Sequence, residues 1–198
     1  MKILKIILIL IAVAVGGFLA VGLIKPSIDY GVTVEVSRSP EVAWAVYLDT
    51  SLLSEWVPEI NSIKQVSGGD EMVGSVYEIS MDHEGQPVIT MEEVTAYEEN
   101  KRMAMIFTND LMTLDNEVVF APKEDGGTTI TSSSTAHGAS LIWRSMFALM
   151  GDGFEQQEAA HMNALVELIE NTEPEIEIPE VETGADSTSV DSLFTDTL

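Results

Sequence analysis

Six strand-like runs follow one another between residues 60 and 136, and each is separated from the next by a few turn-forming residues. Gly68-Gly69-Asp70, Asn109-Asp110 and Asp125-Gly126-Gly127 are three of these turns. The runs cover residues 60–66, 75–82, 87–97, 102–108, 112–120 and 128–136. Connections this short join antiparallel neighbours, because parallel strands need a long crossover. The sequence therefore predicts a meandering antiparallel sheet.

Helical patterns lie on both sides of these strands. Before them, residues 32–36 alternate as one further strand, and Ser39-Pro40 then provides the N-cap and first position of a short helix. A second short helix is expected over 51–56, because Pro58 ends it. After the strands, apolar residues recur at helical spacing as far as Glu170, with an interruption at Gly151-Asp152-Gly153. This order predicts an α+β fold with a long C-terminal helix on one side of the sheet.

The N-terminal run of residues 6–24 contains no charged residue and follows Lys2 and Lys5. As a helix it reaches roughly 28 Å, close to the hydrocarbon thickness of a bilayer. The preceding lysines keep the N-terminus in the cytoplasm, because positive charge favours that side. We therefore expect residues 1–28 to be a signal anchor and linker. The protein would cross the cytoplasmic (inner) membrane once, with its globular domain outside the cytoplasm.

A cleaved signal peptide is the alternative interpretation of this segment. Ala20 and Gly22 supply the small residues of a cleavage site. The apolar run is longer than an ordinary signal-peptide core and continues through Leu23 and Ile24 beyond that site. The length favours the uncleaved anchor.

Charge and cysteine content exclude several classes of protein. The chain has 198 residues, 33 acidic against 9 basic side chains, a net charge of -24 and no cysteine. So acidic a surface repels the phosphate backbone, so no nucleic-acid partner is expected. Without cysteine there are no disulfides and no thiolate metal sites. Residues 173–198 contain eight acids and no base, which predicts a disordered acidic tail and leaves 29–172 as one domain.

Several motifs spread over the chain resemble one known superfamily. They are the stretch 32–49, Leu53-x-x-Trp56-x-Pro58-x-Ile60, Val73-Gly74-Ser75-x-Tyr77, Glu93-Val94 and Gly126-Gly127-Thr128-x-Ile130. Together with the closing helix, they resemble the START-like, helix-grip superfamily (SRPBCC), in particular its polyketide cyclase/dehydrase and lipid-transport branch. The resemblance runs from residue 30 to residue 172. It implies a curved antiparallel sheet of about seven strands around the C-terminal helix, with a cavity for an apolar ligand between them.

Candidate ligand-binding residues follow from that implied cavity and from the high methionine content of the domain. Flexible thioether side chains suit an adaptable apolar site, although each methionine can equally fill an irregular core. Asn116 faces inward if Val118 and Phe120 do, and Ser132 and Ser134 face inward if Ile130 does, because strand side chains alternate. The predicted ligand-binding residues are Met81, Met91, Met103, Met105, Asn116, Phe154, His161 and Leu165.

Catalytic residues are not assigned by any motif. His161 lies beside the apolar stripe of the closing helix, and His137 lies at the end of the last strand. Both are acid/base candidates because histidine titrates near neutrality, and the alternative for His161 is a boundary histidine that caps or covers the core. The three histidines lack the spacing of a metal site, and no phosphate or dinucleotide motif occurs. The sequence therefore predicts no metal and no cofactor.

Three functions are compatible with these features. The expected one is binding or transport of a hydrophobic small molecule or lipid by a membrane-tethered domain. The first alternative is a polyketide cyclase/dehydratase-type enzyme that uses a cavity histidine as acid/base, and the second is a protein-interaction module. The fold by itself does not separate them, and the sequence specifies neither the ligand nor the oligomeric state.

Overall fold

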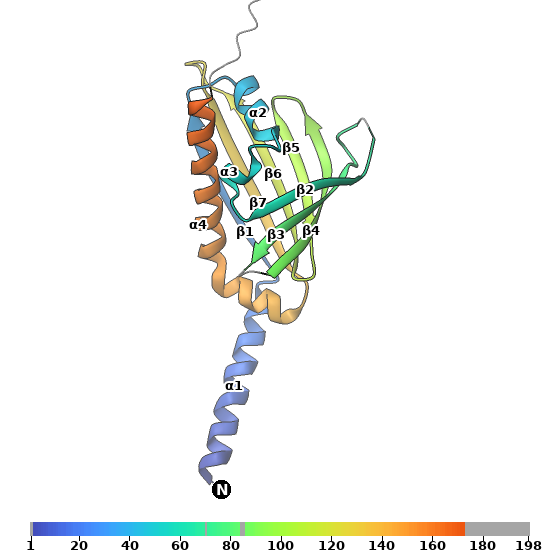
Figure 1. The fold of residues 1–198 in the computed structure, drawn as a ribbon. Coiled ribbons are helices and arrows are strands. Elements are labelled where there is room, and N and C mark those ends of the chain that lie inside the picture. The colour runs from blue at the N-terminus through green and yellow to red at the C-terminus, as the bar shows by residue number, and fades with distance from the viewer. Residues whose placement is uncertain (1, 70, 84–85, 173–198) are drawn as a thin grey trace, which may run out of the picture.

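The computed structural model describes residues 2–69, 71–83 and 86–172 (Figure 1). In chain order the elements are α1 (Lys2–Ile24), β1 (Ser27–Val36), α2 (Pro40–Leu48), α3 (Leu53–Trp56), β2 (Ile60–Ser67), β3 (Val76–His83), β4 (Gln86–Glu98), β5 (Arg102–Thr108), β6 (Met112–Pro122), β7 (Thr128–Gly138) and α4 (Leu141–Asn171). The acidic segment 173–198, for which the sequence predicts disorder, lies outside the described residues.

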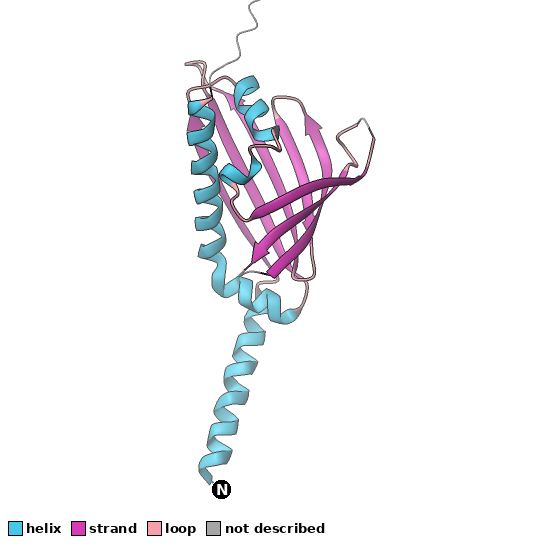
Figure 2. Ribbon diagram, viewed as in Figure 1, coloured by secondary structure: helices cyan, strands magenta, loops and turns pink. Residues whose placement is uncertain are grey.

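The strands form one antiparallel sheet in the order β1-β7-β6-β5-β4-β3-β2. Hairpins connect β2 through β7 in sequence, and the first strand pairs with the last, so that Val34 lies opposite Ile130. The sheet curves around α4, and α2 and α3 lie on the same side of it (Figures 1 and 2). The predicted α+β, helix-grip architecture is confirmed, with strand bounds that differ from the sequence pattern by only a few residues at most ends.

The closing helix α4 is continuous over 31 residues. It begins after Ser140, whose hydroxyl accepts a hydrogen bond from the backbone N–H of Trp143 at 3.3 Å. The sequence predicts an interruption at residues 151–153, but the described helix continues through these residues. The first turns instead lie at a steep angle to the long remainder (Figure 1). Gly151 and Gly153 explain this bend, because a helix changes direction readily where side chains do not brace the turn.

A close-packed core lies between the C-terminal half of α4, α2 and the sheet. Leu165 and Ile169 of α4 are 0% exposed, and Trp44 of α2 is 3% exposed. The ring of Trp44 meets that of Phe120 edge-on, with the centroids 5.1 Å apart. The backbone N–H and the hydroxyl of Ser37 donate hydrogen bonds to the Glu170 carboxylate, which ties the end of α4 to the end of β1.

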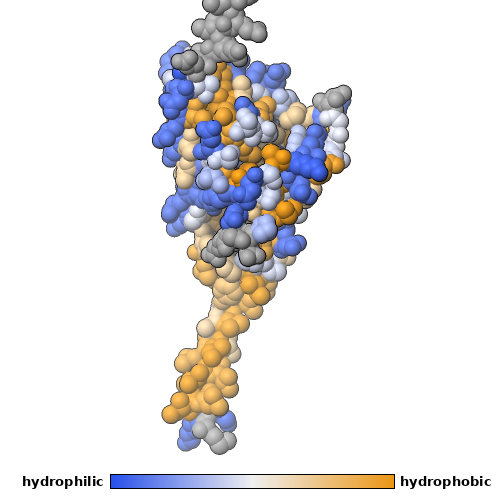
Figure 3. Space-filling view, in the orientation of Figure 1, coloured by the Kyte–Doolittle hydropathy of each residue, from blue (hydrophilic) through white to orange (hydrophobic). Residues whose placement is uncertain are grey.

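The N-terminal helix α1 extends away from the domain and exposes apolar side chains along its length (Figures 1 and 3). It is long and apolar enough to cross a membrane, with a mean hydropathy of 2.9 over its best window. The C-terminal end of α1 packs against the domain, because Gly22 is buried against Ser145 and the backbone of Leu141 in α4. A side chain at position 22 would collide with both, so glycine permits this close helix contact.

Candidate functional site

A cavity of about 510 Å³ lies between the curved sheet, α2, α3 and the middle of α4. Its wall is mainly apolar and is supplied by elements far apart in the sequence. The methionines in the wall are Met72, Met81, Met103, Met105, Met112 and Met162. The aromatic side chains in the wall are Tyr30, Tyr47, Trp56, Tyr77, Phe107 and Phe154. Volume and composition are those of a site for an apolar small molecule.

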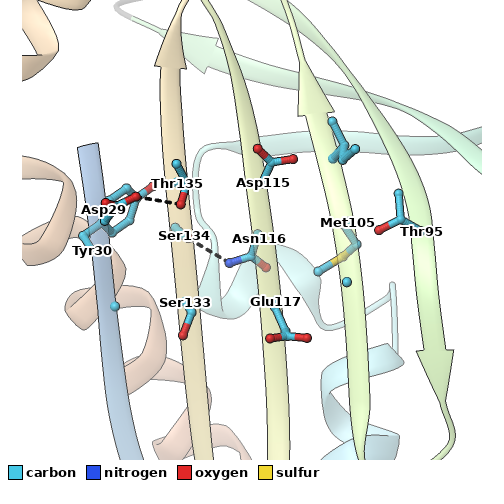
Figure 4. A pocket seen from close by; sticks show the side chains of 13 residues that line it. Asp29, Tyr30, Thr95, Met105, Asp115, Asn116, Glu117, Ser133, Ser134 and Thr135 are labelled. Atoms are coloured by element: carbon cyan, nitrogen blue, oxygen red, sulfur yellow. Dashed lines mark hydrogen bonds between the residues drawn. The ribbon is translucent and has the colours of Figure 1, made fainter. Parts of the chain in front are cut away.

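Asn116 of β6 forms a fixed polar point in this wall. Its Nδ2 donates to Ser132 Oγ at 3.1 Å and to Ser134 Oγ at 2.9 Å, the second of which is drawn in Figure 4. Ser132 and Ser134 belong to β7 and are 1% and 4% exposed. The inward phase that alternation allows for all three residues is the observed one. Because its two amide hydrogens are engaged, the free group that Asn116 offers is its carbonyl oxygen.

Glu92 of β4 is a buried carboxyl group in the same wall. It is 7% exposed and lies between Tyr77 of β3 and Phe107 of β5 in the sheet. No residue in the described part of the chain donates a hydrogen bond to it. Burial raises the pKa of Glu92 to about 7, because the charged form loses its hydration. The cavity thus contains an acid poised between its neutral and charged forms at neutral pH.

Tyr47 of α2 lies within electrostatic reach of Glu92. Burial raises the pKa of Tyr47 well above the usual tyrosine value, and the charges of Glu92 and Glu158 raise it further. Its hydroxyl therefore stays protonated at any ordinary pH. Among the described residues, the one hydrogen-bond contact of that hydroxyl is the sulfur of Met105, at 4.0 Å, which leaves it able to donate to a ligand. The indole Nε1–H of Trp56 is a second donor without a partner among the described residues.

Three polar side chains meet at the cavity wall beside α4. His161 Nε2 lies 3.0 Å from Glu59 Oε2, and Gln157 Nε2 donates to Glu59 Oε1 at 3.1 Å. Burial acts to raise the pKa of Glu59, but its own backbone N–H, the charge of His161 and the two side-chain hydrogen bonds lower it below the usual value on balance. Glu59 therefore stays ionised at neutral pH and orients the imidazole. A carboxylate that orients a histidine is an arrangement able to move a proton.

Most of the ligand-binding residues expected from the sequence line the cavity. They are Met81, Met103, Met105, Asn116, Phe154 and His161. Met91 does not, because Thr90, Glu92 and Val94 are the buried residues of β4 and Met91 alternates to the opposite face. Leu165 does not either, because it is 0% exposed within the close-packed core. For these two residues the structure gives no contact with the cavity.

His137, the other acid/base candidate, lies on the outer face of the sheet. Its inward neighbour Ala136 is 0% exposed, and His137 Nε2 instead lies 3.4 Å from Asp115 Oδ2 outside. A second hollow of about 710 Å³ covers this outer face, where Asp29 and Glu117 also carry carboxylates (Figure 4). It is open to solvent, and Asp29 already accepts a hydrogen bond from Thr135 at 2.8 Å. His137 therefore has no access to the enclosed cavity.

The sequence reasoning missed Glu92, Tyr47 and Glu59. For Glu92 a signal existed, because Thr90, Glu92 and Val94 alternate in one strand and Val94 is an obvious core residue. The alternation places the Glu92 carboxyl group inside the domain, which is unexpected because charged residues are rarely buried. No group of three or more potential metal ligands occurs among the described residues.

Comparisons with known proteins identify the family. The model of the family "Polyketide cyclase / dehydrase and lipid transport" matches residues 27–170. Among solved structures, the chain is similar to the Zhui aromatase/cyclase from Streptomyces sp. R1128, with a TM-score of 0.61 and 14% identity over 73% of this chain and 94% of that one. It is also similar to a START superfamily protein from Mycobacterium smegmatis, with a TM-score of 0.59 and 17% identity over 72% of this chain and 99% of that one.

These structural likenesses are of the fold, since their sequence identities are low. No curated protein sequence matches the chain. The family model covers most of the chain and the whole helix-grip domain, and the matched segment contains every motif on which the sequence resemblance depends. The chain therefore belongs to the polyketide cyclase/dehydrase and lipid-transport family of the START-like superfamily.

Proposed function

We propose that this domain binds a hydrophobic small molecule or lipid in its internal cavity while α1 tethers it to a membrane. The observation that carries the binding proposal is the cavity of about 510 Å³, with an apolar wall and a few inward polar groups. Ligand pockets of roughly 300 to 1,000 Å³ have this composition. A solid core of the same fold would leave no such space, so the methionine-rich wall has a use beyond packing.

Native mass spectrometry of the full chain, released from a fluorinated surfactant, tests this proposal. Such surfactants dissolve hydrocarbon chains poorly, so a bound apolar molecule stays with the protein. We expect an adduct of defined mass in the wild-type protein and its loss in Phe154→Trp, where the larger ring occupies the space. The matched control is Trp143→Phe, which alters an aromatic side chain of α4 outside the cavity wall and keeps the adduct. A wild-type protein that carries no adduct and binds no neutral probe such as phenyl-naphthylamine contradicts the proposal.

Membrane tethering is supported by the way α1 joins the domain. Gly22 packs against Ser145, so removal of α1 would expose a surface of α4 that is buried in the full chain. Close by on α4, Ile142, Leu149 and Met150 are 57%, 65% and 55% exposed. Residues 141–151 contain one basic residue and no acid in a chain of net charge -24. We infer that the first turns of α4 lie at the bilayer surface, where exposed apolar side chains gain a partner.

Two measurements test the tether and its orientation. We expect the protein to stay in the membrane pellet after alkaline extraction, with an intact N-terminus detected by mass spectrometry. Protease should digest the domain only from the non-cytoplasmic side, as the lysines before α1 predict. A mature N-terminus near Leu23 would contradict the tether and favour the cleaved signal peptide.

A second candidate function is acid/base catalysis of the cyclase or dehydratase type. The pairing of His161 with the ionised Glu59 at the cavity wall is the observation that favours it. In this role His161 donates Nε2–H to the ionised Glu59, and its Nδ1 would take a proton from a carbon acid of the bound substrate and return it to a departing or newly formed hydroxyl. A His161→Gln variant that binds the ligand unchanged and loses all turnover would support catalysis. Equal turnover in the variant and the wild type would exclude it.

A further inference from the structure

We propose that the cavity selects an amphiphile whose polar end is a protonated amine, and that the Glu92 carboxyl group, beside Tyr47, holds that amine. This inference deepens the proposed function and rests on it. It names the chemistry of the ligand head group, which neither the apolar wall nor the family determines.

The unpaired state of Glu92 is the first step. Its side chain is 7% exposed, and its sheet neighbours facing the cavity are Tyr77 and Phe107. No described residue donates a hydrogen bond to it. A carboxyl group buried without a donor destabilises the fold, and buried acids are ordinarily paired for this reason. A ligand donor placed at Glu92 removes this cost on binding, so the strand presents an acceptor that the protein itself leaves unused.

The charges around the cavity favour a cation over an anion. Its charged or titratable wall residues are Tyr30, Tyr47, Tyr77, Glu92, Glu158 and His161. None of the described wall residues is a lysine or arginine. Burial raises the pKa of Tyr30 to about 12 and that of Tyr47 further, so both hydroxyls stay neutral. His161 is engaged by Glu59, which leaves the two glutamates as the unneutralised groups and makes the interior repel a carboxylate or phosphate head.

Aromatic rings add to this preference. Tyr47, Tyr77, Trp56 and Phe107 line the same cavity as Glu92, from α2, β3, α3 and β5. The faces of aromatic rings attract cations, most strongly where water is excluded. The unpaired N–H of Trp56 is a single neutral donor and confers no preference between charges. The buried acid and the ring faces therefore converge on one head-group chemistry, an ammonium on an apolar body.

Binding of an ammonium also has a consequence for protons. With a pKa of about 7, Glu92 is about half protonated at neutral pH in the empty cavity. An adjacent positive charge favours the carboxylate, so the proton leaves Glu92 for the buffer as the amine binds. At pH 7 about half a proton is released per amine bound, whereas a neutral alcohol releases none. The other titratable groups that line the cavity with Glu92 are Tyr30, Tyr47, Tyr77, Glu158 and His161.

Three ligands of equal chain length test the inference: octylamine, octanol and octanoate. Each is titrated by calorimetry into the full chain in a fluorinated surfactant at pH 7, in two buffers of different ionisation enthalpy. We expect octylamine to bind about tenfold or more tightly than octanol, and octanoate to bind most weakly, because a charge-assisted hydrogen bond exceeds a neutral one. Proton release should accompany octylamine alone.

Glu92→Gln and Glu93→Gln separate the role of this acid from that of acidity in general. Glu93 is the next residue of β4 and is exposed on the other face of the sheet. In Glu92→Gln, octylamine affinity should fall to that of octanol and proton release should vanish, while Glu93→Gln should bind like the wild type. Octanoate or octanol binding as tightly as octylamine to the wild type overturns the inference and leaves hydrophobic binding intact. Failure of all three ligands to bind overturns the proposed function as well.

Discussion

The two ends of the space between α4 and the sheet are built differently, although one helix covers both. Toward the C-terminus of α4, Leu165 and Ile169 are 0% exposed and pack with Trp44 and Phe120. Nearer its bend, Phe154 faces a cavity of about 510 Å³. Phe154 and Leu165, about three helical turns apart, therefore have different surroundings. The closed end is close-packed and the open end borders a cavity, so the surroundings of a side chain in this fold depend on its position along α4.

The two ends also differ in whether their buried oxygen-containing side chains have hydrogen-bond partners. At the closed end, the buried hydroxyl of Thr128 donates to the carbonyl of Arg38 at 2.7 Å. At the open end, Glu92 is buried with no donor in the described part of the chain. A close-packed region cannot keep an unpaired carboxyl group at a reasonable cost, whereas a cavity can keep one for a ligand. The unpaired carboxyl group thus lies beside the hollow, whereas an unpaired buried group of the closed end, the indole N–H of Trp44, is a neutral donor.

The largest stability effect is expected from truncation at the closed end. Leu165→Ala should lower the free energy of unfolding by about 2 to 5 kcal/mol, because it removes contacts and leaves a void in a packed core. Chemical denaturation of the full chain, followed by tryptophan fluorescence, measures this. Met81→Ala at the cavity wall is the comparison and should cost less than about 1 kcal/mol, since Met81 already borders empty space. Equal losses at the two positions would show that the ends do not differ.

The next effect depends on pH and comes from Glu92. The pKa of Glu92 is about 7 in the folded state against its usual value of 4.5, so the native state binds more protons than the unfolded state between these two pH values. Stability should therefore fall as pH rises from about 4.5 to about 7, by about 3 kcal/mol in total. Glu92→Gln removes this dependence and should be more stable than the wild type at pH 8. The exposed Glu93→Gln should keep the wild-type profile, and an unchanged profile in Glu92→Gln would contradict the buried position.

A smaller loss is expected at Asn116, which bridges two buried serines. Asn116→Ala leaves Ser132 and Ser134 without its amide hydrogens and should cost about 1 to 2 kcal/mol. The control is Ser133→Ala on the outer face of β7, which should change stability by less than about 0.5 kcal/mol. Both are measured by denaturant titration at constant pH. If the two variants were equally stable, the hydrogen-bonded bridge would have no structural role.

The sequence pattern predicts the order of the elements well, because apolar residues recur with a different period in strands and in helices. The alternation around Val118 and Phe120 places Asn116 inward, as the structure has it. The spacing of apolar residues does not indicate which part of the helix faces a cavity and which part faces a packed core. Leu165 and Phe154 both lie on the apolar side of α4. The sequence around each residue does not indicate that the sheet packs directly against Leu165 and leaves a cavity at Phe154. The depth of a cavity is a property of the whole sheet.

Residue type was also a poorer guide to the site than strand phase. Methionine suits an apolar site, which predicts Met91 as a ligand-binding residue, yet Met91 alternates away from Glu92 and Val94. Glu92 is buried in the cavity wall, and the rarity of buried carboxylates works against predicting it from the sequence. The bend of α4 in place of the predicted interruption has a similar origin. Glycine weakens a helix locally, but packing of both halves against the domain keeps the hydrogen bonds in place.

The smallest change in stability, and the largest in binding, is expected at Phe154. Its ring lies 5.6 Å from that of Tyr30 and 5.1 Å from that of Phe147, centroid to centroid, and it borders the cavity. In Phe154→Trp the added ring atoms can enter the open space, so the free energy of unfolding should change by less than about 1 kcal/mol while octylamine affinity falls about tenfold or more. Leu165→Trp is the matched substitution at the closed end, where no space exists, and overpacking should destabilise it by about 1 to 3 kcal/mol. Calorimetric titration and denaturation of both variants measure the two effects together. If Phe154→Trp were as unstable as Leu165→Trp, the region around Phe154 would be packed as tightly as the core, and the protein would have no room for the ligand we propose.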